Sequence, residues 1–241
     1  MAVWAWNAAL SLVCGNAVVW KPSEKTPLCA LACHRLLVLA LRDMGELSRY
    51  PALSVVVNGP KDIGELIAGH AQIPLVSATG SVPMGRSVAE RVARRLGRSL
   101  LELGGNNALI VTASADMNMA LKAVVFSAVG TSGQRCTSLR RLFVHESVAD
   151  AFLEKLVATY KTIAIGDPRD ENNLCGPVIN GKTWDAMSQA INGARIRSGQ
   201  LLVGGEQLVR GQFEEGTCGG GVYLEPAVME VSSDEPLLKQ E

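Results

Sequence analysis

Cys136 is the residue in this chain whose surroundings suggest nucleophilic chemistry. It lies in the segment TSGQRCTS at residues 131–138, after a glycine, a glutamine and an arginine and between hydroxyl residues. A thiol attacks only as the thiolate, and an ordinary cysteine is only a few per cent ionised at neutral pH, so a working cysteine needs a base or an electropositive setting. Without such a partner, Cys136 would be one more small residue near a turn.

Glu102, in the segment LELGGNN, is the carboxylate that can supply this partner. It closes an apolar strand, where we expect a carboxylate to lose hydration, to have a raised pKa and to act as a base toward a thiol or a water molecule. A glutamate at a strand end and a cysteine in a loop are both common. On residue types alone, a purely structural role for the two therefore stays open.

Two further segments have the composition of a nucleotide site. TGSVPMG puts Gly80 and Gly85 between a predicted strand and a predicted helix, where backbone donors and the positive helix end favour a phosphate, although the three-glycine dinucleotide fingerprint is absent. WKPSEKTP follows another strand, so Lys21 and Glu24 would lie at a carboxyl end, within reach of ribose hydroxyls. Taken alone, Lys21 and Glu24 would equally form a solvated turn.

The elements that must position these residues alternate between helix and strand. Strands are predicted at 17–20, 53–57, 73–77 and 99–103, and helices at 3–13, 28–44, 63–68 and from ATGSVPMG to about Leu96. After Gly104-Gly105 a second set follows, with strands at 107–111, 141–145, 200–204 and 222–231 and helices at 116–128, 148–161 and 183–195. This rhythm is typical of parallel strands joined by crossover helices. We predict an α/β protein with domains 1–103 and 104–241 and a loop at 214–221.

Composition excludes several classes of protein. Hydrophobic residues make up 48% and charged residues 19% of the 241 residues, which is typical of a globular chain. Lys plus Arg and Asp plus Glu are both 23, so no net field would attract nucleic acid or an anionic membrane. The first twenty residues are interrupted by Asn7, Ser11, Gly15 and Asn16, which argues against a signal peptide or a membrane span.

The six cysteines are scattered, without the pairing of a metal site or the density of a disulfide scaffold. We interpret them as reduced thiols of a cytoplasmic protein and expect no metal. Cys29, Cys33 and His34 superficially suggest haem attachment, but three residues separate the cysteines, and the stretch is typical of a packed helix with a histidine on its face.

The order and spacing of WKPSEKTP, TGSVPMG, LELGGNN and GQRCTS resemble the aldehyde dehydrogenase superfamily over essentially all 241 residues. ELGGNNALIV and AVGTSGQRCTSLRRLFVHES are most similar to the antiquitin group, which includes enzymes that oxidise aminoadipate semialdehyde (in equilibrium with piperideine-6-carboxylate) in lysine catabolism. The resemblance implies an aldehyde dehydrogenase-like fold, with an incomplete Rossmann-like NAD-binding lobe in 1–103 and an α/β catalytic lobe in 104–241.

The resemblance also implies a role for each motif. Cys136 would be the nucleophile and Glu102 the general base, while Arg135 would bind the substrate's distal carboxylate, a pairing that its planar fork suits. A structural salt bridge is the alternative for Arg135. The cofactor residues would be Lys21 and Glu24 at the adenosine ribose, Thr79, Gly80 and Ser81 at the pyrophosphate, Leu103 and Gly104 at the nicotinamide, and Glu241 at its ribose. An acidic group at the 2′-hydroxyl disfavours NADP, so NAD is expected.

The implied reaction explains these residue types. The Cys136 thiolate adds to a small-molecule aldehyde, donors that include the Cys136 backbone amide hold the oxyanion, and hydride leaves for the nicotinamide. Glu102 then activates the water that hydrolyses the thioester, whereas relatives that transfer the acyl group to coenzyme A lack this base. A coenzyme-A-dependent enzyme is therefore disfavoured.

Members of this superfamily are considerably longer than this chain. The chain begins just after the motif with the asparagine oxyanion donor, and Glu241 is its last residue. We therefore expect an internal fragment without the segments through which the family forms homo-oligomers. A truncated, inactive fragment that binds NAD is the alternative function.

Overall fold

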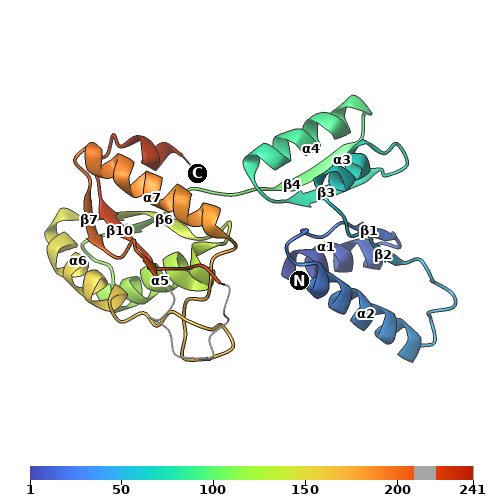
Figure 1. Cartoon of the computed structure of the whole chain (residues 1–241), viewed down its shortest axis with the longest axis horizontal. Helices are drawn as coiled ribbons and strands as arrows, with labels where there is room; N and C mark the ends of the chain where they lie inside the picture. The colour runs from blue at the N-terminus through green and yellow to red at the C-terminus, as the bar shows by residue number, and fades with distance from the viewer. Residues whose placement is uncertain (209–220, 241) are drawn as a thin grey trace. The chain divides into compact units, whose positions relative to one another are not determined.

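The protein forms two compact units, Met1–Leu103 and Gly104–Glu241. A computed structural model describes residues 1–208 and 221–240, and Figure 1 shows the helices and strands of each unit. Cys218, Glu241 and nearly all of the predicted loop at 214–221 lie outside the described residues. The mixture of helices and strands confirms the predicted α/β class.

The first unit alternates strictly between helix and strand. Its elements are α1 (Ala2–Val13), β1 (Val18–Trp20), α2 (Pro27–Asp43), β2 (Ser54–Val56), α3 (Lys61–Gly69), β3 (Leu75–Thr79), α4 (Val82–Arg94) and β4 (Arg98–Glu102). The strands form two parallel pairs, β1 with β2 and β3 with β4. Every predicted helix and strand of this unit is present, with boundaries that differ by about two residues, the usual uncertainty of element ends.

Aromatic and apolar contacts join these elements. Trp4 of α1 stacks on Trp20 of β1 with ring centroids 4.7 Å apart. His34, the predicted helix-face histidine, lies on α2, and its Nε2 is 2.8 Å from the carbonyl oxygen of Ser54 in β2. α4 runs along the β3–β4 pair (Figure 1), where its Val92 forms a small core with Val76 of β3.

The second unit combines parallel and antiparallel pairing. Its elements are β5 (Asn107–Val111), α5 (Met117–Val129), η1 (Gly130–Gly133), β6 (Leu139–Val144), α6 (Glu146–Tyr160), α7 (Gly181–Ile196), β7 (Gln200–Val203), β8 (Gln207–Leu208), β9 (Tyr223–Leu224), β10 (Val228–Glu230) and η2 (Pro236–Lys239). β5 and β6 are parallel, as the crossover rhythm predicts, but β7–β10 and β8–β9 are antiparallel.

The C-terminal part of the second unit corrects the sequence prediction. The strand predicted at 222–231 is two strands, β9 and β10, separated at Glu225-Pro226-Ala227. Proline lacks the N–H that a continuous ladder requires, which explains the break. β8 and the short helix η2 were not predicted, because neither segment is long enough to show a hydrophobic period.

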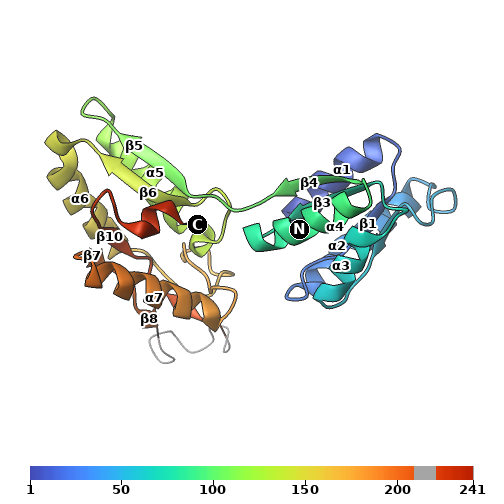
Figure 2. The same ribbon diagram turned by 90° about the horizontal axis from the view of Figure 1, so that it is seen from above.

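The core of the second unit lies between α5, α6 and the strands (Figure 2). Its centre is formed by Val111 of β5, Val124 and Val129 of α5, and Phe152 and Leu156 of α6. This packing fixes the ends of α5 and β6, and the loop that joins them contains Cys136. In the part of the chain that the structure describes, no helix combines the length and the apolar character needed to cross a bilayer.

Candidate functional site

Cys136 lies at the tip of a tight turn formed by Arg135–Ser138. The turn is closed by the N–H of Ser138, which donates to the carbonyl oxygen of Arg135 at 3.1 Å, and by the N–H of Arg135, which donates to Oγ of Ser138 at 3.2 Å. The Cys136 side chain is exposed and its thiol is free. The backbone N–H of Cys136 donates to no acceptor within 1–208 and 221–240. A carbonyl compound at the thiol would therefore find a free backbone donor beside it.

The three residues before Gln134 adopt left-handed backbone torsions in succession. Thr131 has φ 57° and ψ 34°, Ser132 has φ 53° and ψ 37°, and Gly133 has φ 69°. For a residue with a Cβ atom this conformation costs about 1–2 kcal/mol, so it persists only where neighbouring contacts impose it. Composition predicts a loop here but cannot predict this backbone geometry, which strain makes rare.

Side chains of the strained segment make the contacts that impose it. Oγ1 of Thr131 accepts a hydrogen bond from Nε of Arg135 at 2.7 Å, and Oγ of Ser132 donates to the carbonyl oxygen of Gly176 at 2.8 Å. The carbonyl oxygen of Gly133 accepts from Nη2 of Arg140 at 2.8 Å. The segment is thus attached to β6 and to the chain near residue 176.

Gln134 attaches the same loop to a second stretch of backbone. Its Oε1 accepts from the N–H of Ile179 at 2.8 Å, and its Nε2 donates to the carbonyl oxygens of Thr131 at 3.2 Å and Pro177 at 3.4 Å. No role for Gln134 followed from the sequence, although it lies in the GQRCTS motif. An amide with both a donor and an acceptor, two residues before the nucleophile, was the signal that could have identified it.

The LELGGNN segment contacts the cysteine turn directly. Nδ2 of Asn107 donates to the carbonyl oxygens of Cys136 at 2.7 Å and Ser138 at 2.9 Å. A Cβ atom on Gly105 would lie 3.1 Å from the carbonyl oxygen of Cys136, so glycine allows the close approach of the two segments. Neither contact was predicted, because register between β5 and β6 decides it.

Cys175 forms a contrast with Cys136. It is only 1% exposed, and its Sγ lies 3.5 Å from the carbonyl oxygen of Val129, to which it donates. Burial raises the pKa of the Cys175 thiol to about 11, an effect that the Ser132 hydrogen bond partly opposes. Burial likewise raises the pKa of neighbouring Tyr160 to about 12, with a smaller contribution from the charge of Cys175. Cys175 is therefore a neutral packing residue behind the loop that holds Cys136.

Arg135 projects from the same turn. Its guanidinium lies 5.9 Å from the ring centroid of Phe126 and donates through Nε to Thr131. No ion pair among the described residues includes Arg135, so the alternative of a structural salt bridge finds no support there. Its Nη groups make no hydrogen bond to the described chain and can bind a carboxylate.

The predicted phosphate segment and Glu102 lie side by side in the first unit. Thr79 pairs with Glu102 in the parallel β3–β4 ladder, and the N–H of Gly80 donates to the carbonyl oxygen of Glu102 at 3.1 Å. Both therefore occupy the carboxyl ends of these strands, where open α/β sheets bind ligands. The Glu102 side chain is exposed, so the first unit does not supply the loss of hydration that the sequence predicted.

Ser81 is the N-cap of α4, and its Oγ accepts from the N–H of Met84 at 3.4 Å. The N–H groups of Ser81 and Val82 donate to no described residue, which leaves two donors at the positive end of a 13-residue helix. Leu103 packs against this helix: a Cβ atom on Gly85 would lie 2.5 Å from a Leu103 methyl carbon. The donors and the helix end suit a pyrophosphate.

Lys21 and Glu24 follow the carboxyl end of β1. Lys21 Nζ lies 3.2 Å from Glu24 Oε2, with side chains 16% and 56% exposed respectively. Hydrogen bonding to backbone, and then the bond and charge of Lys21, lower the pKa of the Glu24 carboxyl. Glu24 is thus an anion at neutral pH and can accept hydrogen bonds from sugar hydroxyls.

The predicted residues therefore form two groups. Lys21, Glu24, Thr79, Gly80, Ser81, Glu102 and Leu103 belong to the first unit, and Gly104, Arg135 and Cys136 to the second. Glu241 lies outside the described residues. Among the side chains that the structure describes, no cluster of three or more His, Cys, Asp or Glu residues is placed to hold a metal ion.

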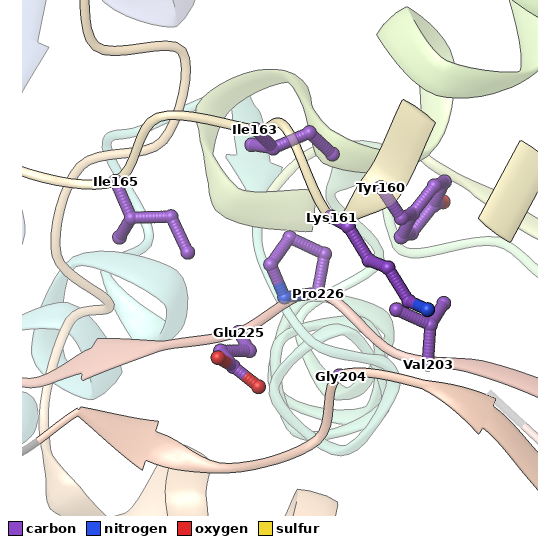
Figure 3. A pocket seen from close by; sticks show the side chains of 8 residues that line it. All are labelled: Tyr160, Lys161, Ile163, Ile165, Val203, Gly204, Glu225 and Pro226. Carbon is purple, nitrogen blue, oxygen red and sulfur yellow. The ribbon is translucent and has the colours of Figure 1, made fainter. Parts of the chain in front are cut away.

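A cavity of about 240 Å³ in the second unit involves none of these residues (Figure 3). It is lined by the end of α6 and by the chain around β7 and Pro226, namely Tyr160, Lys161, Ile163, Ile165, Val203, Gly204, Glu225 and Pro226. Tyr160 also contributes to the core that contains Cys175. The cavity was not predicted from the sequence, because its lining comes from segments far apart in the chain.

Comparison with known proteins shows which family these motifs belong to. The sequence profile described as "Aldehyde dehydrogenase family" matches residues 1–241. "Aldehyde dehydrogenase family 7 member A1" of Brassica napus is 42% identical over 241 residues, which is 100% of this chain and 46% of that protein. "Alpha-aminoadipic semialdehyde dehydrogenase" of Bos taurus is 37% identical over 240 residues, 99% of this chain and 44% of that protein.

A solved structure shows the same fold. Betaine aldehyde dehydrogenase of Staphylococcus aureus, in complex with NAD⁺, superposes with a TM-score of 0.82 at 25% identity, covering 100% of this chain and 45% of that one. The chain thus spans less than half the length of the proteins that it matches. The likeness confirms the predicted superfamily, its fold and the antiquitin-like character of the sequence.

Proposed function

Because the chain belongs to the aldehyde dehydrogenase family, we propose that it supplies the nucleophile, the general base and part of the cofactor site of an enzyme that oxidises an aldehyde to a carboxylic acid with NAD. The observation that carries the proposal is the Cys136 turn. It combines an exposed thiol with a backbone N–H that has no acceptor in the described chain. Cys175, in contrast, is buried with a raised pKa, which suits a structural thiol.

The residues of this chain would act in a fixed order. The Cys136 thiolate adds to the carbonyl carbon of the aldehyde, and the Cys136 N–H stabilises the resulting oxyanion. NAD, when bound, supplies the hydride acceptor that oxidises this adduct to a thioester. Glu102 then removes a proton from the attacking water, the carbon–sulfur bond breaks, and the acid leaves.

Connectivity supports a joint role for Glu102 and Cys136. Gly105 approaches the carbonyl oxygen of Cys136 closely, and Glu102 precedes Gly105 by three residues in the chain. Glu102 and Gly105 thus belong to one motif, LELGGNN, whose second half contacts the turn of the nucleophile. The exposed Glu102 side chain would lose its hydration when substrate and cofactor cover it.

Groups of the first unit support NAD as the proposed cofactor. At the start of α4, Ser81 and Val82 offer the pyrophosphate two N–H donors that no described residue accepts, with Thr79 and Gly80 beside them. Lys21 and the ionised Glu24 would bind the adenosine ribose, and a negative charge there would repel the additional phosphate of NADP. Leu103 and Gly104 would face the nicotinamide, and Glu241 its ribose.

Arg135 would select the substrate. Its Nη groups, which make no hydrogen bond to the described residues, lie next to the nucleophile and suit a carboxylate at the far end of the aldehyde. The name of the Bos taurus relative indicates aminoadipate semialdehyde as such a substrate. Cytoplasmic location and assembly into homo-oligomers stay predictions.

The test is a hybrid enzyme in which residues 1–241 replace the matching segment of the Brassica napus relative. We expect NADH formation from aminoadipate semialdehyde, faster with NAD than with NADP. Cys136→Ser should abolish turnover, Glu102→Gln should stop the reaction at the acyl-enzyme, and Arg135→Ala should raise KM for this aldehyde more than for propanal. A folded hybrid that binds NAD but forms no NADH would favour the inactive NAD-binding chain instead.

A further inference from the structure

We propose that Asn107 is the positioning residue of the nucleophile: its side-chain amide fixes the Cys136 turn so that the backbone N–H of Cys136 points at the developing oxyanion. The inference rests on the proposed function, because it assumes that Cys136 attacks a carbonyl carbon. No role for Asn107 followed from the sequence.

The geometry of the amide carries the first step. Nδ2 has two hydrogens, and Asn107 uses them on two carbonyl oxygens of one turn, those of Cys136 at 2.7 Å and Ser138 at 2.9 Å. These carbonyls belong to the peptide units 136–137 and 138–139, so a single planar group restrains two peptide planes of the turn. A hydroxyl or a carboxylate in the same place could not donate twice.

The second step concerns the backbone N–H of Cys136. The turn uses the N–H groups of Arg135 and Ser138 for its own closure. The N–H of Cys136 has no acceptor in the described chain. The Cys136 N–H shares a peptide plane with the Arg135 carbonyl, which the Ser138 N–H holds, and Asn107 holds the Cys136 carbonyl in the next plane. Both peptide planes that meet at Cys136 are therefore restrained, and the direction of its N–H with them. Stabilisation of an oxyanion depends on donors that are already aimed before the reaction.

The third step is the rigidity of the support. Asn107 is the first residue of β5 and pairs with Leu139 of β6, immediately after Ser138. β5 continues into the core through Val111, which is 1% exposed. The amide is therefore mounted on a packed strand and not on a loop. The neighbouring Asn106, in contrast, donates to the carbonyl oxygen of Leu238 and makes no hydrogen bond to the cysteine turn.

Two thiol reactions on the 241-residue chain distinguish the orientation of the Cys136 N–H from the exposure of the Cys136 thiol. Nitrophenyl acetate acylates a thiolate: the sulfur bonds to the carbonyl carbon, an oxyanion forms, and the carbon–oxygen bond breaks to release nitrophenolate. Iodoacetamide alkylates the same thiolate by displacement of iodide, with no oxyanion. The acylation rate constant of Cys136 is divided by its alkylation rate constant, both measured by mass spectrometry of the Cys136 peptide. This ratio reports the orientation of the Cys136 N–H. The exposed Cys14 and Cys29 serve as internal references.

We expect Asn107→Ala and the isosteric Asn107→Asp to lower this ratio by at least about tenfold, toward the 10²- to 10³-fold typical of a lost oxyanion donor. The matched control Asn106→Ala should leave it unchanged. Circular dichroism and continued protection of the buried Cys175 of the same unit from iodoacetamide establish folding. If both variants unfold, Asn107→Ser, which keeps one donor, should give a smaller fall.

The outcomes distinguish the two proposals. If nitrophenyl acetate does not acylate Cys136 in the unmodified chain faster than it acylates Cys14 and Cys29, the proposed function loses its nucleophile. If Cys136 is acylated faster but folded Asn107 variants keep the same ratio, the positioning role of Asn107 is wrong while the nucleophile stands.

Discussion

A methyl group on Gly105 would lie 3.1 Å from the carbonyl oxygen of Cys136 and 3.1 Å from Oδ1 of Asn107. These distances are shorter than ordinary van der Waals contacts, so the added methyl must displace the cysteine turn or the amide that holds it. The second glycine of LELGGNN is therefore required because any larger residue would collide with the backbone of the nucleophile.

The first prediction concerns this contact. Gly105→Ala should slow acylation of Cys136 by nitrophenyl acetate about three- to tenfold, because a shift of a few tenths of an ångström misaligns the reacting atoms without removing them. It should also destabilise the second unit by about 1–3 kcal/mol, as overpacking does. Gly181→Ala is the control, since a Cβ atom there meets nothing within 4 Å. Equal rates for both variants would contradict the prediction.

The second prediction concerns cofactor choice. Replacing Glu24 by Gln removes the negative charge beside Lys21 Nζ, 3.2 Å away. It should narrow the preference for NAD over NADP by about tenfold, because one charge repulsion is lost. Lys21→Ala should weaken the binding of both cofactors. Titration of each cofactor against tryptophan fluorescence measures the two dissociation constants. An unchanged NAD-to-NADP ratio in Glu24→Gln would exclude Glu24 from the ribose site.

The third prediction concerns the buried thiol. The folded-state pKa of Cys175 is raised from 9.0 to about 11, so the unfolded chain loses this proton first as pH rises. The free energy of unfolding should therefore fall above pH 9, with a slope that approaches about 1.4 kcal/mol per pH unit from this group. Cys175→Ala should lack that part of the slope. Urea unfolding of both proteins between pH 8 and pH 11 measures the difference.

The fourth prediction concerns acid. The hydrogen bonds from Arg197, which hold the 2% exposed Glu235 side chain, lower the pKa of that carboxyl below its ordinary value of 4.5. The stabilisation is present above about pH 4.5 and disappears as pH falls through the lower folded-state pKa. Thermal unfolding of Glu235→Gln should therefore depend less on pH below 4.5 than that of the unmodified chain. Parallel curves would show that the pair does not contribute.

Much of the fold followed from local sequence. Prolines and glycines delimit the helices, and the β-branched runs at 53–57 and 107–111 are strands, because hydrophobic period and turn residues act over a few positions. The antiparallel pairing of β7 with β10 did not follow, since their register joins residues 200–203 to 228–230. Pairing across such separations depends on packing and leaves no local signal.

The candidate site, like the fold, was predictable only in part from the sequence. Residue types made Cys136 and Glu102 candidates, and the resemblance of their motifs to aldehyde dehydrogenases implied their roles. The contacts of Asn107 and Gln134 were not predictable, since an asparagine or glutamine beside a motif is equally compatible with a solvated turn. In the structure, Nδ2 of Asn107 donates to two carbonyl oxygens, and Oε1 of Gln134 accepts from the N–H of Ile179. The exposure of Glu102 also differs from what its apolar neighbours indicated.

Thr131 and Ser132 are L residues held in torsions that mirror-image residues prefer. Glycine usually destabilises a folded chain. At these two positions, however, Thr131→Gly or Ser132→Gly would relieve the strain in the backbone of the loop. The hydroxyl groups explain why this coil is not built from glycine, since they bind Arg135 and Gly176. Selection at these two positions would thus favour the hydrogen-bonded loop conformation over an unstrained backbone. Libraries in which the loop is randomised should therefore recover hydroxyl side chains before glycine.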